Sequence, residues 1–158
     1  MTALTLDQAN RIIDAILRRA AEINCRPLSV IVVEPGCKVK AFQKEDGSSM
    51  IRFEMAFGKA YAALALGRSS KLVKVRAEER PMFMRYLISA SGDQIFPEGG
   101  GLQIRNLDGE VIGAVGVTGD TEDRDEELAA HGIHAAGFKT DANFDGMGRH
   151  AGVRLTNR

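Results

Sequence analysis

A strand, a tight turn, a second strand and a helix follow one another within residues 99–137, and this run constrains the fold more than any other part of the chain. Asp108-Gly109 is a dipeptide that favours a two-residue hairpin turn. Asp120 or Thr121 can then cap a helix with an acidic first turn. The apolar strand positions on the two sides of the turn are Leu102, Ile104, Val111 and Ile112. A hairpin that leads into a helix is typical of α+β domains.

The rest of the chain repeats this alternation. Thr5 and Gln8 form a capping box before an apolar helical face, and residues 28–33 and 38–42 read as a hairpin. Helical periodicity returns over residues 49–66 and again after Pro81. The order helix, hairpin, helices, hairpin, helix contains no strand–helix–strand crossover. It predicts an α+β fold with a mostly antiparallel sheet of about five strands, one of them near Ile95 or within the glycine run, and helices packed against it.

Length and charge exclude several classes of protein. The 158 residues fit one domain, which we place at residues 1–137, followed by a glycine-rich tail at 138–158 that lies over a neighbouring subunit or is irregular. Lys and Arg number 21, and so do Asp and Glu, so no net field attracts nucleic acid. The N-terminus has no signal-peptide pattern and the apolar runs are strand-sized. We therefore expect a cytoplasmic protein with no nucleic-acid or membrane partner.

Two histidines on the last predicted helix are candidates for chemistry. His131 and His134 are spaced i, i+3, which places both on one side of the helix. They can supply a haem ligand, chelate a metal or act as an acid–base pair, or they are surface residues near a helix C-terminus. The spacing of the sequence dictates no third ligand, so no metal site is predicted.

A glycine loop is the second candidate. Gly99, Gly100 and Gly101 follow Glu98 and read as a flexible loop whose open amides contact a small carboxylate or line a pocket. A wide turn into a strand is the alternative. We take Glu98 to Gly101, with His131, as the predicted ligand-binding residues.

Several glycine-spaced motifs resemble a known family. They are the segments FGKAYAA at 57–63, FPEGGG at 96–101, GEVIGAVGVTG at 109–119 and DEE at 125–127. In this order they resemble the GlcG/HbpS-like family, also called the haem-degrading domain family. The resemblance implies a profilin-like three-layer sandwich around an antiparallel sheet, and a homo-oligomer. Some relatives bind haem, and others lie among catabolic genes.

The resemblance also makes Lys59 a candidate site residue, because it matches the lysine in the family's helix of small residues. Lys59, the glycine loop and His134 form the predicted pocket. Two functions follow. The first is a small-molecule binding protein with haem or a related tetrapyrrole as its possible cofactor. The second is a catabolic isomerase, hydrolase or lyase for a small organic acid or oxygenated ring compound, with His134 as base and Lys59 as carboxylate clamp.

Overall fold

The computed structural model describes residues 3–144, and its centre is a four-stranded antiparallel sheet. The strands lie in the order β2-β1-β4-β3, which places the first and last hairpins side by side. The α+β class predicted from the sequence is confirmed. The bounds of the strands are β1 Ser29–Glu34, β2 Lys38–Lys44, β3 Gly101–Arg105 and β4 Val111–Thr118.

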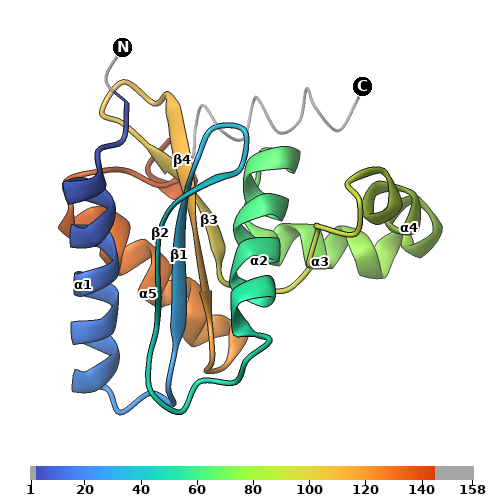
Figure 1. Cartoon of the computed structure of the whole chain (residues 1–158). Coiled ribbons are helices and arrows are strands. Elements are labelled where there is room, and N and C mark those ends of the chain that lie inside the picture. Colours follow the sequence, from blue (N-terminus) through green and yellow to red (C-terminus); the bar gives the residue numbers. More distant parts are fainter. Residues whose placement is uncertain (1–2, 145–158) are drawn as a thin grey trace.

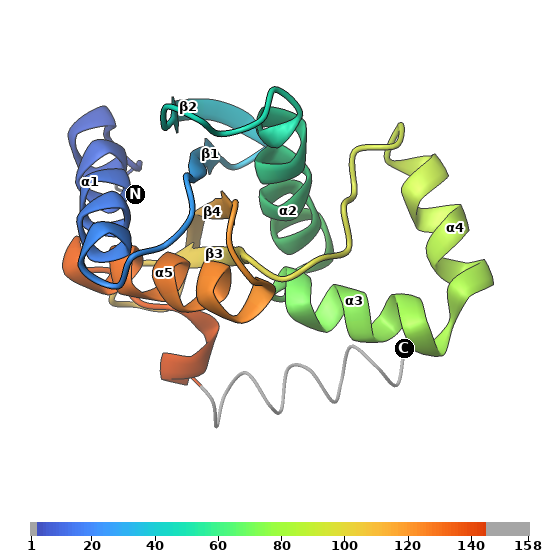
Figure 2. The ribbon, with the colours of Figure 1, turned by 90° about the horizontal axis from the view of Figure 1, so that it is seen from below.

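Helices cover both faces of the sheet, so the molecule has three layers. Figures 1 and 2 show α1 (Leu6–Glu22) and α5 (Glu122–Ala135) on one face and α2 (Arg52–Leu66) on the other. Beyond α2, α3 (Ser70–Glu79) and α4 (Pro81–Ala90) extend away from the sheet. None of the helices within residues 3–144 is both long enough and apolar enough to span a bilayer.

Local signals in the sequence set most helix starts. The capping box of Thr5 and Gln8 is present at α1, where the Thr5 hydroxyl accepts from the Gln8 amide. Thr121 caps α5 in the same way by accepting from the amide of Arg124. These two predictions are confirmed. Each such cap satisfies an amide that the first helical turn leaves unpaired.

Two details of the strands differ from the prediction. The connection from β3 to β4 is the five-residue loop 106–110. Gly109 has a positive φ, but Asp108 does not. The Asn106 side chain accepts from the amides of Asp108 and Glu110, which stabilises this longer loop in place of a two-residue turn. No fifth strand forms within the described residues. The segment near Ile95 is held to α2 instead, where the Phe96 amide donates to the Gly58 carbonyl.

Two glycines of β4 allow neighbouring elements to approach closely. A Cβ at Gly116 would lie 2.0 Å from the Ala56 carbonyl oxygen of α2. A Cβ at Gly113 would lie 2.4 Å from the Val33 carbonyl oxygen. Helix α2 therefore rests directly on the backbone of β4.

The chain after α5 returns to the sheet. Lys139 and Arg105 exchange two backbone hydrogen bonds at the free edge of β3. A 3-10 turn at Asp141–Phe144 follows, and Asp141 forms an ion pair with Arg105. The remainder of the tail, residues 145–158 with His150, lies outside the described residues. Docking of the tail on a neighbouring subunit stays a prediction.

Candidate functional site

The loop at residues 98–101 passes between α2 and the start of α5. A Cβ at Gly101 would lie 2.1 Å from the Lys59 carbonyl oxygen. A Cβ at Gly100 would lie 2.3 Å from the Val117 carbonyl oxygen and 3.1 Å from Cδ of Lys59. These glycines are required because the loop is packed against backbone on both sides, which no larger residue could accommodate.

The backbone polar groups of this loop form hydrogen bonds with residues of the neighbouring helices and of β4. The Gly99 amide donates to Oε1 of Glu122 at 2.8 Å, and the Gly101 amide donates to Oγ of Ser70 at 2.7 Å. The Gly100 carbonyl accepts from the Val117 amide. The sequence indicated open amides here, whereas the amides of Gly99 and Gly101 are occupied by side chains that neighbouring helices supply.

Lys59 forms a buried ion pair beneath the loop. Its Nζ lies 3.1 Å from Oδ2 of Asp125 and donates to the Val117 carbonyl at 2.9 Å, and its side chain is 3% exposed. The other carboxylate oxygen of Asp125 accepts from the Asp120 amide. Burial lowers the pKa of Lys59 and raises the pKa of Asp125, and in each case the partner's charge opposes the shift. The pair joins α2 to α5 and does not face solvent.

A second charged group lies at the surface of the same junction. Nζ of Lys74 on α3 lies 3.3 Å from Oε2 of Glu98 and also contacts Glu122 at the start of α5. A hydrogen bond with Glu98 is the largest cause that lowers the pKa of Glu122, to about 2. The same contact raises the pKa of Glu98. Environments that push the pKa values of two carboxyls apart are typical of acid–base pairs.

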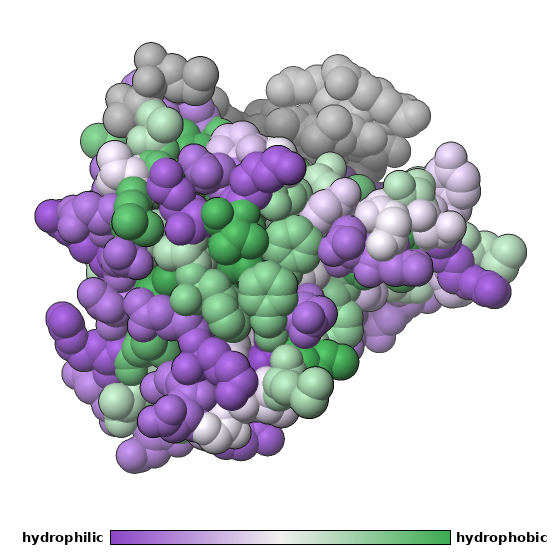
Figure 3. All heavy atoms as spheres, viewed as in Figure 1, coloured by the Kyte–Doolittle hydropathy of each residue, from purple (hydrophilic) through white to green (hydrophobic). Residues whose placement is uncertain are grey.

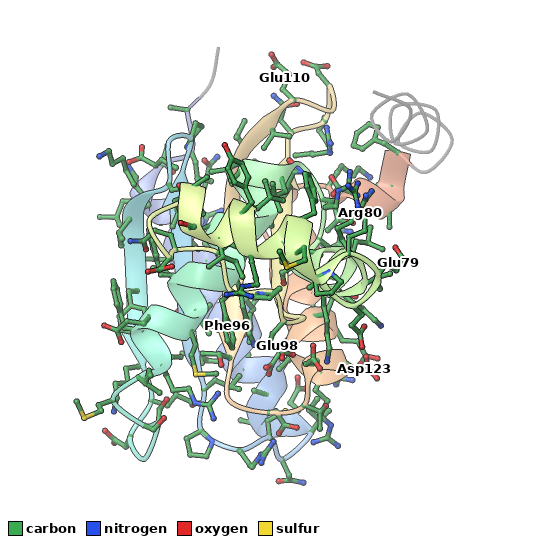
Figure 4. The ribbon with its side chains drawn as sticks, turned by 90° about the vertical axis from the view of Figure 1, so that its right-hand side faces the viewer. Glu79, Arg80, Phe96, Glu98, Glu110 and Asp123 are labelled. Atoms are coloured by element: carbon green, nitrogen blue, oxygen red, sulfur yellow. The ribbon has the colours of Figure 1, made fainter. Side chains whose placement is uncertain are left out.

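Lys74 and Glu122 line a cleft between α3 and α5. Its volume is about 310 Å³, and Figure 4, which views this side of the molecule, shows Glu98 and Asp123 near the start of α5. A larger hollow of about 620 Å³ lies at the end of α1 and contains no predicted site residue. The residues that line the α3/α5 cleft are Lys71, Lys74, Val75, Glu78, Glu122 and Asp123.

His131 and His134 lie elsewhere. Both are exposed on the last turns of α5, and His134 follows Asp125 by nine residues, which is about 13 Å along a helix. Nε2 of His134 lies 2.8 Å from Oδ1 of Asn143, so this histidine ties the 3-10 turn to α5. Within residues 3–144, no cluster of three His, Cys, Asp or Glu side chains is arranged to hold a metal ion.

The structure thus brings together part of the predicted pocket. Lys59 and the loop at 98–101 are in contact, whereas His134 is distant from both. Sequence reasoning missed Ser70, Lys74 and Glu122, which supply the partners of the loop. Their separation along the chain left no periodicity or spacing to indicate these contacts.

Comparisons with known proteins agree with this architecture. The family model described as haem degrading protein HbpS-like matches residues 4–134. This chain belongs to the HbpS-like family. An uncharacterised 15.0 kDa protein encoded in the dhaT-dhaS intergenic region of Citrobacter freundii is 32% identical over 130 residues, which are 82% of this chain and 89% of that protein. The family resemblance seen in the sequence is therefore confirmed.

Three solved structures share the fold. The ORFY protein of Klebsiella pneumoniae is 26% identical with a TM-score of 0.76, over 86% of this chain and 92% of that chain. A structure titled PduOC:Heme complex is 22% identical with a TM-score of 0.78, over 88% of this chain and 99% of that chain. HbpS of Streptomyces reticuli, as a double mutant, is 23% identical with a TM-score of 0.74, over 87% of this chain and 89% of that chain.

Proposed function

We propose that this protein binds a small molecule, with haem or a related tetrapyrrole as the ligand, and that it works in the cytoplasm as a homo-oligomer. One observation carries the proposal: the fold spans almost the whole of a relative whose structure is titled as a haem complex. Membership of a family described as haem degrading supports the same ligand class.

The described residues supply an axial ligand more readily than an enclosing pocket. His131 is exposed and forms no hydrogen bond with the described residues, so its imidazole is available to iron. One ring nitrogen of His134, Nε2, already bonds to Oδ1 of Asn143. Neither hollow described above includes a histidine. We therefore propose His131 as the axial ligand, with His134 second, and a neighbouring subunit as the source of the apolar walls that haem needs.

Haemin titration tests this proposal. We expect a shift of the Soret band at stoichiometric haemin in the wild-type protein and its loss in His131→Ala, because an axial imidazole changes the iron's ligand field. Glu127→Ala is a matched control, since Glu127 is also exposed on α5 and offers no axial ligand. Absence of any shift in the wild-type protein would refute haem binding, and an unchanged shift in His131→Ala would exclude this ligand.

A catabolic enzyme is the second candidate, and the Glu98–Glu122 pair favours it. Glu98 contacts Lys74, which lines the cleft, and its pKa is raised, which suits proton transfer. Lys59, by contrast, is buried and bonded to Asp125. We propose Glu98 as the proton-transfer group, with a small organic acid as substrate. The roles of His134 as base and Lys59 as carboxylate clamp stay predictions from the sequence. In a panel of small hydroxy acids, a turnover that survives in Glu98→Gln would refute this assignment.

A further inference from the structure

Two aspartates that precede a glycine lie in the described part of the chain, and the structure holds their backbones differently. Asp46 and Gly47 lie in the turn between β2 and α2, and Asp108 and Gly109 lie in the loop between β3 and β4. An aspartate before a glycine can close a succinimide ring readily, because glycine has no side chain to hinder the attacking nitrogen. The two pairs therefore allow a comparison within one molecule.

The first pair is exposed, and its glycine amide is not engaged. Asp46 and Gly47 are both exposed. The Ser48 amide closes the turn by donating to the Glu45 carbonyl at 3.1 Å, and the Gly47 amide makes no hydrogen bond with any residue that the structure describes. Figure 3 shows mostly hydrophilic residues at the lower end of this face, where Figure 1 places the connection from β2 to α2. The Gly47 nitrogen is therefore open to solvent and to the neighbouring carboxyl.

The second pair is held in its loop. Asp108 is exposed like the aspartate of the first pair, so exposure does not distinguish the two. The Gly109 amide, however, donates to the Asn106 carbonyl at 3.0 Å. The Asn106 side chain also accepts from the amides of Asp108 and Glu110. Gly109 is half-buried, and a Cβ there would lie 3.3 Å from the Phe144 ring. This amide must break a hydrogen bond before it can approach the carboxyl.

We propose that Asp46 is a modification site, at which the chain converts without an enzyme to an isoaspartyl link, and that the loop protects Asp108 from the same reaction. The Gly47 nitrogen bonds to the side-chain carboxyl carbon of Asp46, and the hydroxyl of that carboxyl leaves with the amide proton as water. Water then adds to the main-chain carbonyl of the succinimide and breaks its bond to the nitrogen. The chain afterwards runs through the former side-chain carbonyl. One water is released and one is consumed, so the composition and the oxidation state do not change.

The product alters the attachment of the turn to the start of β1. An isoaspartyl link adds one methylene to the main chain between two anchors. Before the link, the Glu45 amide donates to the Leu28 carbonyl at 2.9 Å, and the Leu28 amide donates to Oε1 of Glu45 at 2.8 Å. After it, the buried hydroxyl of Ser48 lies 2.7 Å from the hydroxyl of Ser29. The added length must therefore distort the turn or break one of these anchors.

Ageing of the full chain at neutral pH, followed by tryptic peptide mapping, tests the proposal. Trypsin cleaves after Lys and Arg, so the two pairs are released on separate peptides, residues 45–52 and 106–124. The pair Asp145-Gly146, which lies outside the described residues, falls on residues 140–149 and does not interfere. In the folded protein we expect the isoaspartyl form to accumulate about tenfold faster in residues 45–52 than in 106–124, because the Gly109 amide must first lose its hydrogen bond. In urea the two rates should become similar.

Two variants complete the test. Asp46→Glu keeps the charge at an exposed position and should abolish the product in residues 45–52, because a glutamate must close a larger ring that forms much more slowly. Asn106→Ala removes the side chain that accepts from the amides of the β3–β4 loop, and it should speed the reaction at Asp108 in the folded protein. The proposal is overturned by equal rates at the two pairs in the folded protein, by a difference that persists in urea, or by an unchanged rate at Asp108 in Asn106→Ala.

Discussion

The absence of a side chain at Gly101 is required by a segment that lies far from it in the sequence. Its Cα lies so close to the Lys59 carbonyl that a Cβ would meet that oxygen at 2.1 Å and Oγ of Ser70 at 2.9 Å. Its φ is not positive, so the requirement is purely one of space. Gly116, the cross-strand partner of Gly101, meets the Ala56 carbonyl on the same side of α2, so the helix backbone lies directly on both strands.

We expect Gly101→Ala to lower the free energy of unfolding by about 3 kcal/mol, since the methyl group must displace α2 or the start of β3. Urea denaturation measures the change. Gly36→Ala is the matched control, because a Cβ there meets nothing within 4 Å and only its positive φ is strained. The control should lose about 1 kcal/mol. Equal losses in the two variants would contradict the packing argument.

Sequence reasoning succeeds at the residue scale where the cause is local. Thr5, Thr121 and Gly109 act on neighbours within a few residues, and their roles as caps and turn residue could be inferred. Gly101 was recognised as part of a loop, but the carbonyl that requires it belongs to residue 59. No signal in the sequence reports which distant backbone a glycine meets.

Among the elements, the junction of α3, α5 and the glycine loop depends on ionisation. Glu98 holds a proton in the folded state above its ordinary pKa of 4.5, and Glu122 releases one well below it, at about 2. Between pH 2 and 4.5 the unfolded chain binds more protons at Glu122, so stability rises with pH. Above 4.5 the folded chain binds more protons at Glu98, so stability falls until its raised pKa is passed.

The Glu98–Glu122 pair should therefore contribute most to the free energy of unfolding near pH 4.5. We expect the free energy of unfolding of the wild type, relative to Glu122→Gln, to rise from pH 2 to 4.5 and to decline at higher pH. Urea denaturation across this range measures the difference. Glu127→Gln, at an exposed position of the same helix, should give a flat difference. A flat difference for Glu122→Gln as well would show that the two carboxyls do not share a proton.

Element order was predictable, and the partners of the elements were predictable only in part. Periodicity and turn residues placed both hairpins and the helices that follow them. The fifth strand was wrong because the segment near Ile95 uses its backbone to bind α2. For the candidate site, the resemblance picked out Lys59 and Asp125 as parts of separate motifs. Their pairing arises only when α2 and α5 meet at one end of the sheet.

At the scale of the whole molecule, the Lys59–Asp125 pair connects the two helical layers. Helix α2 covers one face of the sheet and α5 the other, and the pair crosses from one to the other beside Val117. Both side chains are almost completely buried, at 3% and 2% exposed. Loss of either charge would leave the other without compensation in a region that water does not reach.

We expect Lys59→Met alone to cost about 3–5 kcal/mol of unfolding free energy, and the double variant K59M/D125N to cost less, because no unpaired charge then remains. Thermal and urea denaturation measure both. Lys71→Met removes the lysine of the exposed pair with Asp123, and it should leave the free energy of unfolding nearly unchanged. A double variant less stable than Lys59→Met would show that the Asp125 carboxylate stabilises the fold by itself.

The strand order determines how late in its synthesis the protein can fold. Strand β1 lies in the middle of the sheet, yet one of its neighbours, β4, is encoded near the end of the chain. A ribosome that has released β1 and β2 holds a hairpin whose inner edge is unpaired until Thr118 emerges. Stable folding must therefore wait until most of the chain has left the exit tunnel, and premature termination before β4 would release a chain prone to aggregate.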